Sequence, residues 1–294
     1  MELHARGQRL QFPRRPLIMG IVNLNDDSFC GDGTLDADLA LQQARQMALD
    51  GADVIDAGAE SARTNRPPVS IDEETARFAR FVPAWLDWCH SVKDQAPPFD
   101  SNQVWPPWLS LNTWRPEVVS RILPMGGHLL NDIGALPDES NARLCAEHGA
   151  ALLVMHSMGR PKEKHTHILW PDIMGELEQF FARKITMCRT AGLPENAIVL
   201  DPGIDFAKQK PDNLTIFHEA RRLQQFGRPV LLPVSRKTVI ADVLNRPDPL
   251  DRDAGTLACI ASGITAGVQI FRVHAVKPAA EAVKVLWAIC SAGD

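Results

Sequence analysis

The sequence lacks several features that would place it in common classes of protein. No stretch approaches the roughly 18 apolar residues of a membrane-spanning helix. The basic segment from Met1 to Arg15 is not followed by the apolar run of a secretory signal. Basic residues are not in excess, since 31 Lys and Arg stand against 36 Asp and Glu. We therefore expect neither a membrane nor a nucleic acid as a partner.

Cysteine pairs at metal-binding or redox spacing are also absent. The cysteines are scattered, and none form a C-x-x-C pair; they are Cys30, Cys89, Cys145, Cys188, Cys259 and Cys290. This distribution favours free thiols in the reducing cytoplasm over disulfides or a zinc site. A G-x-G-x-x-G motif is missing after the first apolar run, which weakens the case for a dinucleotide-binding domain.

What the sequence does contain is an alternation of short apolar runs with segments of helical periodicity. The runs, bounded by turn residues, are 17–24, 54–59, 108–113, 128–133, 151–156, 198–203, 229–235 and 269–274. Such runs are typical of strands buried on both faces, and the alternation indicates a parallel sheet with crossover helices. Their number and the chain length predict an α/β fold, a single-domain (β/α)8 TIM barrel over residues 1–294. Residues 93–108, rich in Pro and Trp, are expected to form a packed irregular insertion.

The stretch from Ile198 to Lys208 shows how one of these runs ends. Three apolar residues lead into Asp201, and Pro202 then ends the strand because it cannot donate to a ladder. A carboxylate held at the end of a buried strand is costly unless a partner binds it. That partner is either a protein cation or a ligand, and this strand alone leaves both possibilities open.

The other runs also end in polar residues. Together, the polar residues at the ends of the runs are Asn23, Asp56, Asn112, Asn131, Asp132, His156, Asp201, Ser235, Arg236, Lys237, Arg272 and His274. Because the carboxyl ends of barrel strands form one face, these residues predict a polar small-molecule site there.

The chemistry of these residues suits a flat heterocycle that carries a diphosphate. Asp201 and Asn131 offer acceptors and donors to a planar ring. Asn23 is an acceptable ligand for Mg²⁺ that is held mostly by phosphate and water. Phosphate oxygens suit the basic residues Arg63, Arg272 and His274.

A series of motifs carries a resemblance that covers Leu17 to Ile289. The motifs are Met-Gly-Ile-Val-Asn at 19–23 with Asp-Ser-Phe at 27–29, Asp-Ala-Gly-Ala-Glu-Ser at 56–61 with Arg63, Asn-Asp-Ile at 131–133, Val-Met-His at 154–156, Asp-Pro-Gly at 201–203 with Phe206 and Lys208, Ser-Arg-Lys at 235–237 and Arg-Val-His at 272–274. With these motifs the chain resembles the dihydropteroate synthase family, barrels that join a pterin methyl diphosphate to p-aminobenzoate. Pterin-dependent corrinoid methyltransferases share the fold and the pterin pocket, but the last two motifs favour the synthases.

The resemblance implies a role for each residue that matches a family motif. The pterin would be held by Asn112, Asn131, Met155, Asp201, Phe206 and Lys237; Mg²⁺ by Asn23; the diphosphate by Arg63, Arg272 and His274; and the acceptor by Arg63, Lys237 and Thr238. Catalysis would involve Lys237, Asn112 and Asp56, although a structural role for Asp56 is equally compatible with the sequence. In the family the diphosphate leaves first, and the amine of p-aminobenzoate captures the pterin methylene cation. Family members are usually dimers, which predicts a homodimer through residues 258–266 and 279–290.

The chain departs from the family pattern at the third strand, where Asn112 replaces an Asp that faces the pterin. Removing a unit charge about 4 Å from a developing cation costs up to about 4 kcal/mol at an effective dielectric of about 20, or roughly a thousandfold in rate. Other departures lie on the loop and acceptor side, at Asn25, Asp26, Ala62, Thr64, Asn65 and Thr238. The expected function is a dihydropteroate synthase-like transferase with Mg²⁺ as cofactor. A diverged paralogue with another amine acceptor or little catalysis is the alternative, and a pterin-dependent methyltransferase is a third.

Overall fold

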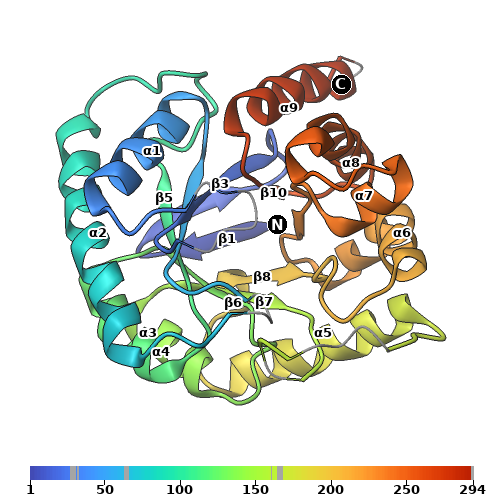
Figure 1. The fold of residues 1–294 in the computed structure, drawn as a ribbon, viewed down its shortest axis with the longest axis horizontal. Coiled ribbons are helices and arrows are strands. Elements are labelled where there is room, and N and C mark those ends of the chain that lie inside the picture. Colours follow the sequence, from blue (N-terminus) through green and yellow to red (C-terminus); the bar gives the residue numbers. More distant parts are fainter. Residues whose placement is uncertain (27–30, 32, 63–65, 160, 164–167, 293–294) are drawn as a thin grey trace.

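The computed structural model describes residues 1–26, 31, 33–62, 66–159, 161–163 and 168–292. Its centre is a ring of parallel strands: β3 (Leu17–Asn23), β4 (Val54–Gly58), β5 (Trp108–Asn112), β6 (Leu129–Asp132), β7 (Ala151–Met155), β8 (Ile198–Asp201), β9 (Leu231–Pro233) and β10 (Ile270–Val273). The hydrogen-bonded order is β8-β7-β6-β5-β4-β3-β10-β9. A bridge between Leu200 and Val230 joins β8 to β9. The strands therefore form a nearly closed barrel, which confirms the predicted fold class (Figure 1).

Each strand lies within one of the apolar runs. Every residue of β4, β5 and β7 is buried, as expected for strands with one face toward the barrel axis and the other toward the helices. The observed strands are shorter than the runs by one or two residues at an end. The extra residues belong to the loops before or after the strands, and polar residues such as Asp56, Asn112 and Asp201 lie at or near the carboxyl ends of the strands themselves.

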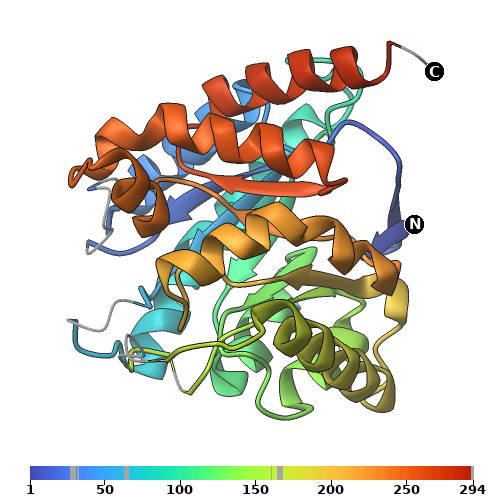
Figure 2. The same cartoon turned by 90° about the vertical axis from the view of Figure 1, so that its right-hand side faces the viewer.

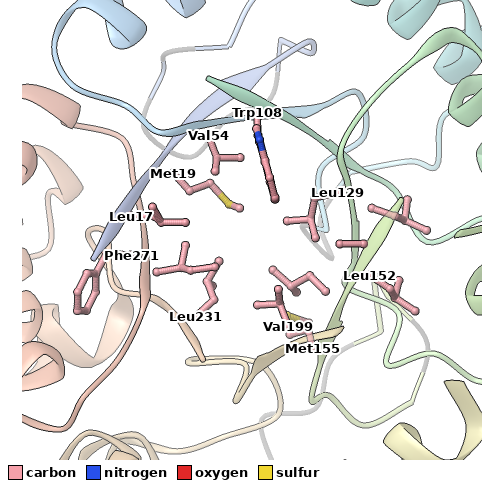
Figure 3. Close-up of a cluster of buried hydrophobic side chains, with 14 of the residues drawn as sticks. Leu17, Met19, Val54, Trp108, Leu129, Leu152, Met155, Val199, Leu231 and Phe271 are labelled. Carbon is pink, nitrogen blue, oxygen red and sulfur yellow. The ribbon is translucent and has the colours of Figure 1, made fainter. Parts of the chain in front are cut away.

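Alternation along the strands decides which side chains point into the barrel. Figure 3 shows Val54, Trp108, Leu129 and Val199 pointing into the ring as part of the buried core. Because side chains alternate along a strand, residues two positions further along also point inward. This arrangement puts a polar layer above the apolar one, at the carboxyl ends of the strands, formed by Asp56, Ser110, Asn131 and Asp201.

Helices surround the barrel (Figure 1): α1 (Ala37–Leu49), α2 (Ile71–Val92), α3 (Pro116–Ile122), α4 (Ser140–His148), α5 (Ile173–Thr190), α6 (Lys210–Glu219), α7 (Thr238–Leu244), α8 (Asp253–Thr265) and α9 (Val276–Cys290). Short 3-10 turns are η1 (Leu123–Met125), η2 (Glu195–Ala197), η3 (Ala220–Phe226) and η4 (Pro249–Arg252). The side chain of Asp36 caps α1, and that of Ser70 caps α2 by accepting from the backbone N–H of Glu73 at 3.1 Å. The sequence pattern did not predict α7, which has seven residues and, unlike α3, no proline in its first turn to mark its start.

A hairpin that the apolar pattern did not predict covers the amino ends of the barrel strands. It consists of β1 (Glu2–Ala5) and β2 (Gln8–Gln11), paired antiparallel. The backbone N–H of Arg6 donates to the carbonyl of Gly149 at 2.6 Å, and Trp108 Nε1 donates to Gln8 Oε1 at 2.6 Å. Gly149 and Trp108 precede or begin strands of the ring, so the hairpin lies opposite the polar end (Figure 2).

The predicted insertion at residues 93–108 is irregular up to the start of β5, and it is packed. Gln103 is buried and its Nε2 donates to the carbonyls of Ala48 and Ala52 at 2.8 and 2.9 Å. These bonds hold the insertion against the end of α1 and explain why a loop without regular structure is ordered here. Among the described helices, none combines the length and the apolar character needed to cross a membrane.

Candidate active site

The polar residues of the barrel mouth lie on neighbouring strands in register. Gly58 on β4 pairs with Asn112 on β5, and Asn112 pairs with Asn131 on β6. On the other side, Met155 at the end of β7 pairs with Asp201 at the end of β8. The parallel sheet thus brings the sequence-predicted residues of these four strands to one end of the barrel, as predicted.

Asp56 is the centre of the first set of contacts. It is fully buried, and its carboxylate accepts from Ser110 Oγ at 2.6 Å and from Arg272 Nε at 2.7 Å. Asn112 Nδ2 donates to Asp56 Oδ2 at 3.3 Å, and Asn131 Nδ2 donates to both carboxylate oxygens at 3.2 and 3.1 Å. We call these five residues the Asp56 cluster. The sequence left a catalytic and a structural role open for Asp56, and both stay predictions; the contacts show that its carboxylate is held by four neighbouring side chains.

The two asparagines of the Asp56 cluster present their carbonyl oxygens to the mouth. A carboxylate accepts hydrogen bonds and cannot donate, so each amide must turn its Nδ2 group toward Asp56. The Oδ1 atoms of Asn112 and Asn131 are buried and have no hydrogen-bond partner among the described residues. A buried acceptor without a partner costs about 1–3 kcal/mol, so both oxygens favour a ligand that donates.

Asp201 is the centre of the second set. It is buried, its Oδ1 accepts from the backbone N–H of Gly203 at 2.7 Å, and burial raises the pKa of the carboxyl to about 6. Gly203 has φ +68°, and a Cβ at this position would lie 2.0 Å from the carbonyl oxygen of His156. The loop after β8 therefore passes so close to the end of β7 that glycine is required, and this fixes the position of Asp201.

A buried lysine joins the same two strand ends. Lys208 Nζ donates to Nδ1 of His156 at 2.8 Å and to the carbonyl oxygen of Phe206 at 2.9 Å. Burial lowers the pKa of Lys208 to about 7, and burial with the nearby Lys208 charge lowers the pKa of His156 to about 2. A neutral His156 is consistent with its ring nitrogen accepting from the lysine. The motifs included both residues, but no role was predicted for Lys208.

Lys237 enters the mouth from the loop between β9 and α7. Its Nζ donates to the carbonyl of Ile204 at 3.0 Å and lies 5.2 Å from the centre of the Phe206 ring. Burial lowers the pKa of Lys237, because desolvation disfavours the charged ammonium. The contact brings together two of the predicted pterin residues. We call Asp201, His156, Lys208 and Lys237 the Asp201 group.

The remaining predicted residues of this side lie in the same loops. Thr238 is exposed, and its backbone N–H donates to Asp205, which follows β8. His274 Nδ1 lies 2.9 Å from Ser235 Oγ, so the ends of β9 and β10 are linked. Arg236 pairs with Asp253 through two contacts of 2.8 and 3.0 Å, which directs its guanidinium toward α8.

A second network holds the loop that follows β4. Glu60 is buried; its Oε1 accepts from the backbone N–H of Val69 at 3.0 Å and contacts Lys162 Nζ at 3.1 Å. Arg115 contacts Glu60 at 2.8 Å and also pairs with the buried Glu74. The sequence did not reveal this network, because its members lie on loops and helices far apart in the chain.

Metal binding was predicted for Asn23, at the end of β3. Asn23 is half-buried beside Gly58, its register partner on β4. Among the described residues, no group of three or more His, Cys, Asp or Glu side chains is arranged to hold a metal ion. The donor set therefore fits only an ion that receives most of its ligands from a bound diphosphate and water.

Some predictions concern residues outside the described part of the chain. Arg63, predicted for both the diphosphate and the acceptor, is one of them, as are residues 27–29 of the first motif and Thr64 and Asn65.

Comparisons with known proteins identify the family of the chain. The family model described as "Pterin binding enzyme" matches residues 19–274. The chain belongs to the pterin binding enzyme family. The dihydropteroate synthase of Escherichia coli (strain K12) is 33% identical over 295 residues, covering 100% of this chain and 98% of that protein.

Solved structures of family members have the same fold. The Yersinia pestis dihydropteroate synthase with a sulfonamide drug complex is 35% identical, with a TM-score of 0.86 over 99% of this chain and 100% of that one. The Thermus thermophilus synthase in complex with 4-aminobenzoate is 31% identical, with a TM-score of 0.82 over 98% of this chain and 100% of that one. The comparisons confirm the resemblance that the motifs indicated, and this family member is an enzyme of the dihydropteroate synthase type.

Proposed function

We propose that the chain condenses 6-hydroxymethyl-7,8-dihydropterin diphosphate with p-aminobenzoate and releases diphosphate, a step of folate biosynthesis. The observation that carries the proposal is the set of buried acceptors at one end of the barrel: Asn112 Oδ1, Asn131 Oδ1 and the Asp201 carboxylate. A pterin ring carries several N–H donors along one edge and requires such acceptors. The dihydropteroate synthase of Thermus thermophilus, similar over the whole barrel, binds 4-aminobenzoate.

The chain's own residues would bind and orient the two substrates. Asn112, Asn131 and Asp201 accept from the pterin, Lys237 donates to it, and Met155 and Phe206 pack near its ring. The bond between the pterin methylene and the diphosphate oxygen breaks, and the electron pair leaves with the diphosphate. The amine nitrogen then bonds to the methylene and loses a proton. The diphosphate oxygens would be bound by Arg63, Arg272 and His274, with Arg63, Lys237 and Thr238 near the acceptor.

Magnesium would enter this site with the diphosphate. Asn23 supplies a neutral oxygen at the end of β3, and the bound ion would neutralise charge on the leaving group. Because Asn23 contributes a single neutral oxygen, we expect little Mg²⁺ binding without the diphosphate.

A second candidate is a paralogue that binds the pterin with little catalysis. Asn112 favours it, because a carboxamide keeps the hydrogen bond to the ligand but supplies no charge to a developing cation. The Asp56 carboxylate lies behind Asn112, and its charge is balanced by Arg272 at 2.7 Å. The cluster therefore does not restore the lost charge.

The test measures diphosphate release from the dihydropterin diphosphate with Mg²⁺, with and without p-aminobenzoate, for the wild type and for Asn112→Asp. Release that depends on p-aminobenzoate supports the synthase. Release that appears only in Asn112→Asp supports the weakly catalytic paralogue. Release without coupling to p-aminobenzoate indicates another acceptor, and failure of both proteins to bind the pterin diphosphate contradicts both candidates.

We also propose a homodimer that uses α9. The apolar side chains of Val285 and Ile289 on this helix are 59% and 65% exposed, which is unfavourable in a monomer and suits a contact with a second copy. Light scattering on the purified protein gives the mass. A monomer at micromolar concentration, or an unchanged dimer in Val285→Glu with Ile289→Glu, contradicts this interface.

A further inference from the structure

The orientation of the two asparagine amides restricts which ligand groups can bind more than the residue types alone do. At the sequence level, Asn131 was expected to offer both a donor and an acceptor. In the structure the donor groups of Asn131 and Asn112 are both engaged by Asp56, at distances of 3.1 to 3.3 Å. The Nδ2 atom of each amide therefore lies on the Asp56 side, and the carbonyl oxygens, both buried and without a partner among the described residues, are the acceptors left for a ligand.

We infer that Asp56 is a positioning residue that fixes both amides as acceptors and so makes the site selective for the reduced, 7,8-dihydro form of the pterin. The inference rests on the proposed function. Asp56 is itself fully buried and is held by Ser110 at 2.6 Å and Arg272 at 2.7 Å. It touches no ligand and acts through the two asparagines.

The chemistry of the pterin edge supplies the selectivity. A 7,8-dihydropterin carries N8–H and the 2-amino group on either side of ring nitrogen N1, so this edge offers two separated donors. Asn112 and Asn131 are register partners on adjacent strands, and adjacent strands lie about 4.8 Å apart. Full oxidation removes the hydrogen from N8 and leaves a lone pair there. One of the two carbonyl oxygens would then face an acceptor instead of a donor.

An oriented amide discriminates more strictly than a carboxyl group at the same place. A carboxyl group can take up a proton and donate to an unprotonated ring nitrogen. Asn112 cannot turn its Nδ2 toward the ligand without placing its oxygen against the Asp56 carboxylate. Discrimination between the two pterin forms should therefore be steeper here than in a barrel with Asp at this position.

The experiment compares the binding of 6-hydroxymethyl-7,8-dihydropterin and 6-hydroxymethylpterin by calorimetry. The wild type should bind the dihydro form at least about tenfold more tightly, since one unpaired buried acceptor has this effect. In Asp56→Asn the amides are free to turn, and the ratio of the two affinities should fall to within about threefold. The ratio is independent of the fraction of protein that is folded. Ser110→Ala is the matched control, because it removes one donor to Asp56 and leaves both amides fixed; its ratio should stay that of the wild type.

A second pair of variants keeps the test decisive if Asp56→Asn does not fold. In Asn112→Asp and Asn131→Asp, the carboxyl that faces N8 should gain affinity for the oxidised pterin as the pH is lowered. Equal wild-type affinities for the two forms overturn the inference and leave the proposed function standing. Failure to bind either form overturns both. If the ratio of the two pterin affinities in Asp56→Asn equals that of the wild type, Asp56 does not determine the selectivity.

Discussion

Each side of the barrel mouth contains a buried carboxylate, but the two carboxylates differ in how many hydrogen bonds they accept. In the Asp56 cluster, four side chains donate to one carboxylate and an arginine balances its charge. In the Asp201 group, the described residues supply one hydrogen bond to the carboxylate, from the backbone of Gly203 at 2.7 Å. Burial raises the pKa of Asp201 to about 6 and lowers that of the nearby Lys208 to about 7.

We interpret this difference as a division between residues that position the site and residues that would bind the pterin. A carboxylate whose acceptor sites are all used forms few further hydrogen bonds with a ligand. Its main effect is to hold the neighbouring side chains in place. A buried carboxylate with few partners is costly in the free protein and is stabilised when a ligand donates to it. We therefore expect pterin binding to depend strongly on individual polar atoms of the Asp201 group. The Asp56 cluster should keep its arrangement when one of its donors is lost.

The largest effect should come from removing the Asp201 carboxylate. Asp201→Ala deletes charge-assisted hydrogen bonds to the pterin and should weaken pterin binding by about 100-fold or more, measured by calorimetry. Asp242→Ala, which removes an exposed carboxylate on α7, is the control and should bind as the wild type does. A loss below tenfold in Asp201→Ala would show that the Asp201 group does not carry pterin binding.

The next effect concerns the close approach that fixes Asp201. Gly203→Ala places a Cβ 2.0 Å from the His156 carbonyl oxygen at φ +68°, and we expect a loss of about 3 kcal/mol or more in the free energy of unfolding. Gly227→Ala has a similar φ of +62° with no atom within 4 Å. Gly227→Ala should lower the free energy of unfolding by only about 1 kcal/mol, the cost of placing an alanine in the left-handed conformation. Urea unfolding measures both, and equal losses would mean that the contact with His156 does not constrain the loop.

The apolar pattern was enough to predict the barrel, but not every element of it. Each ring strand is a buried run such as Val54–Gly58, and burial on both faces leaves a clear signal in sequence. The hairpin leaves only a weak one, because β1 and β2 have four residues each and β2 buries a single residue, and its contact with Trp108 comes from Gln8, far away in the sequence. Such long-range contacts have no local pattern.

At the candidate site, the sequence predicted which residues lie at the barrel mouth, but not the orientation of their amides or their pairing. The strand ends identify Asn112 and Asn131, whereas which atom of each amide faces the ligand depends on Asp56. Ser110 lies two residues before Asn112 on the same face of β5, so strand alternation was a signal that could have found it. Lys162 contacts Glu60 from a loop about 100 residues away, which no local pattern reports.

A smaller effect should appear in the pH dependence of stability. Because the folded state raises the pKa of Asp201 to about 6, it holds this proton more tightly than the unfolded chain does. Stability is therefore lost as the pH rises from about 4 toward about 6 and beyond. Relative to Asp201→Asn, the wild type should lose about 1.5 kcal/mol of unfolding free energy between pH 5 and 7.5. The comparison with the variant cancels other groups, such as Asp132, whose pKa burial also raises to about 6. A difference that grows in the opposite direction would mean that Asp201 is stabilised as a carboxylate without ligand.

The smallest effect should be the loss of one donor from the Asp56 cluster. Ser110→Ala removes the 2.6 Å bond from Oγ to Asp56 Oδ1, but the two amides and Arg272 still donate. A hydrogen bond to a charged group contributes about 1.5–3 kcal/mol, and retained partners that relax toward the carboxylate recover part of it. We expect a loss of about 1 kcal/mol in unfolding free energy and less than about threefold in pterin affinity. Ser120→Ala, whose exposed hydroxyl donates to the carbonyl of Glu117, should change neither. If Ser110→Ala abolished pterin binding, the cluster would depend on single atoms as the Asp201 group does, and the division between positioning and binding sides would not hold.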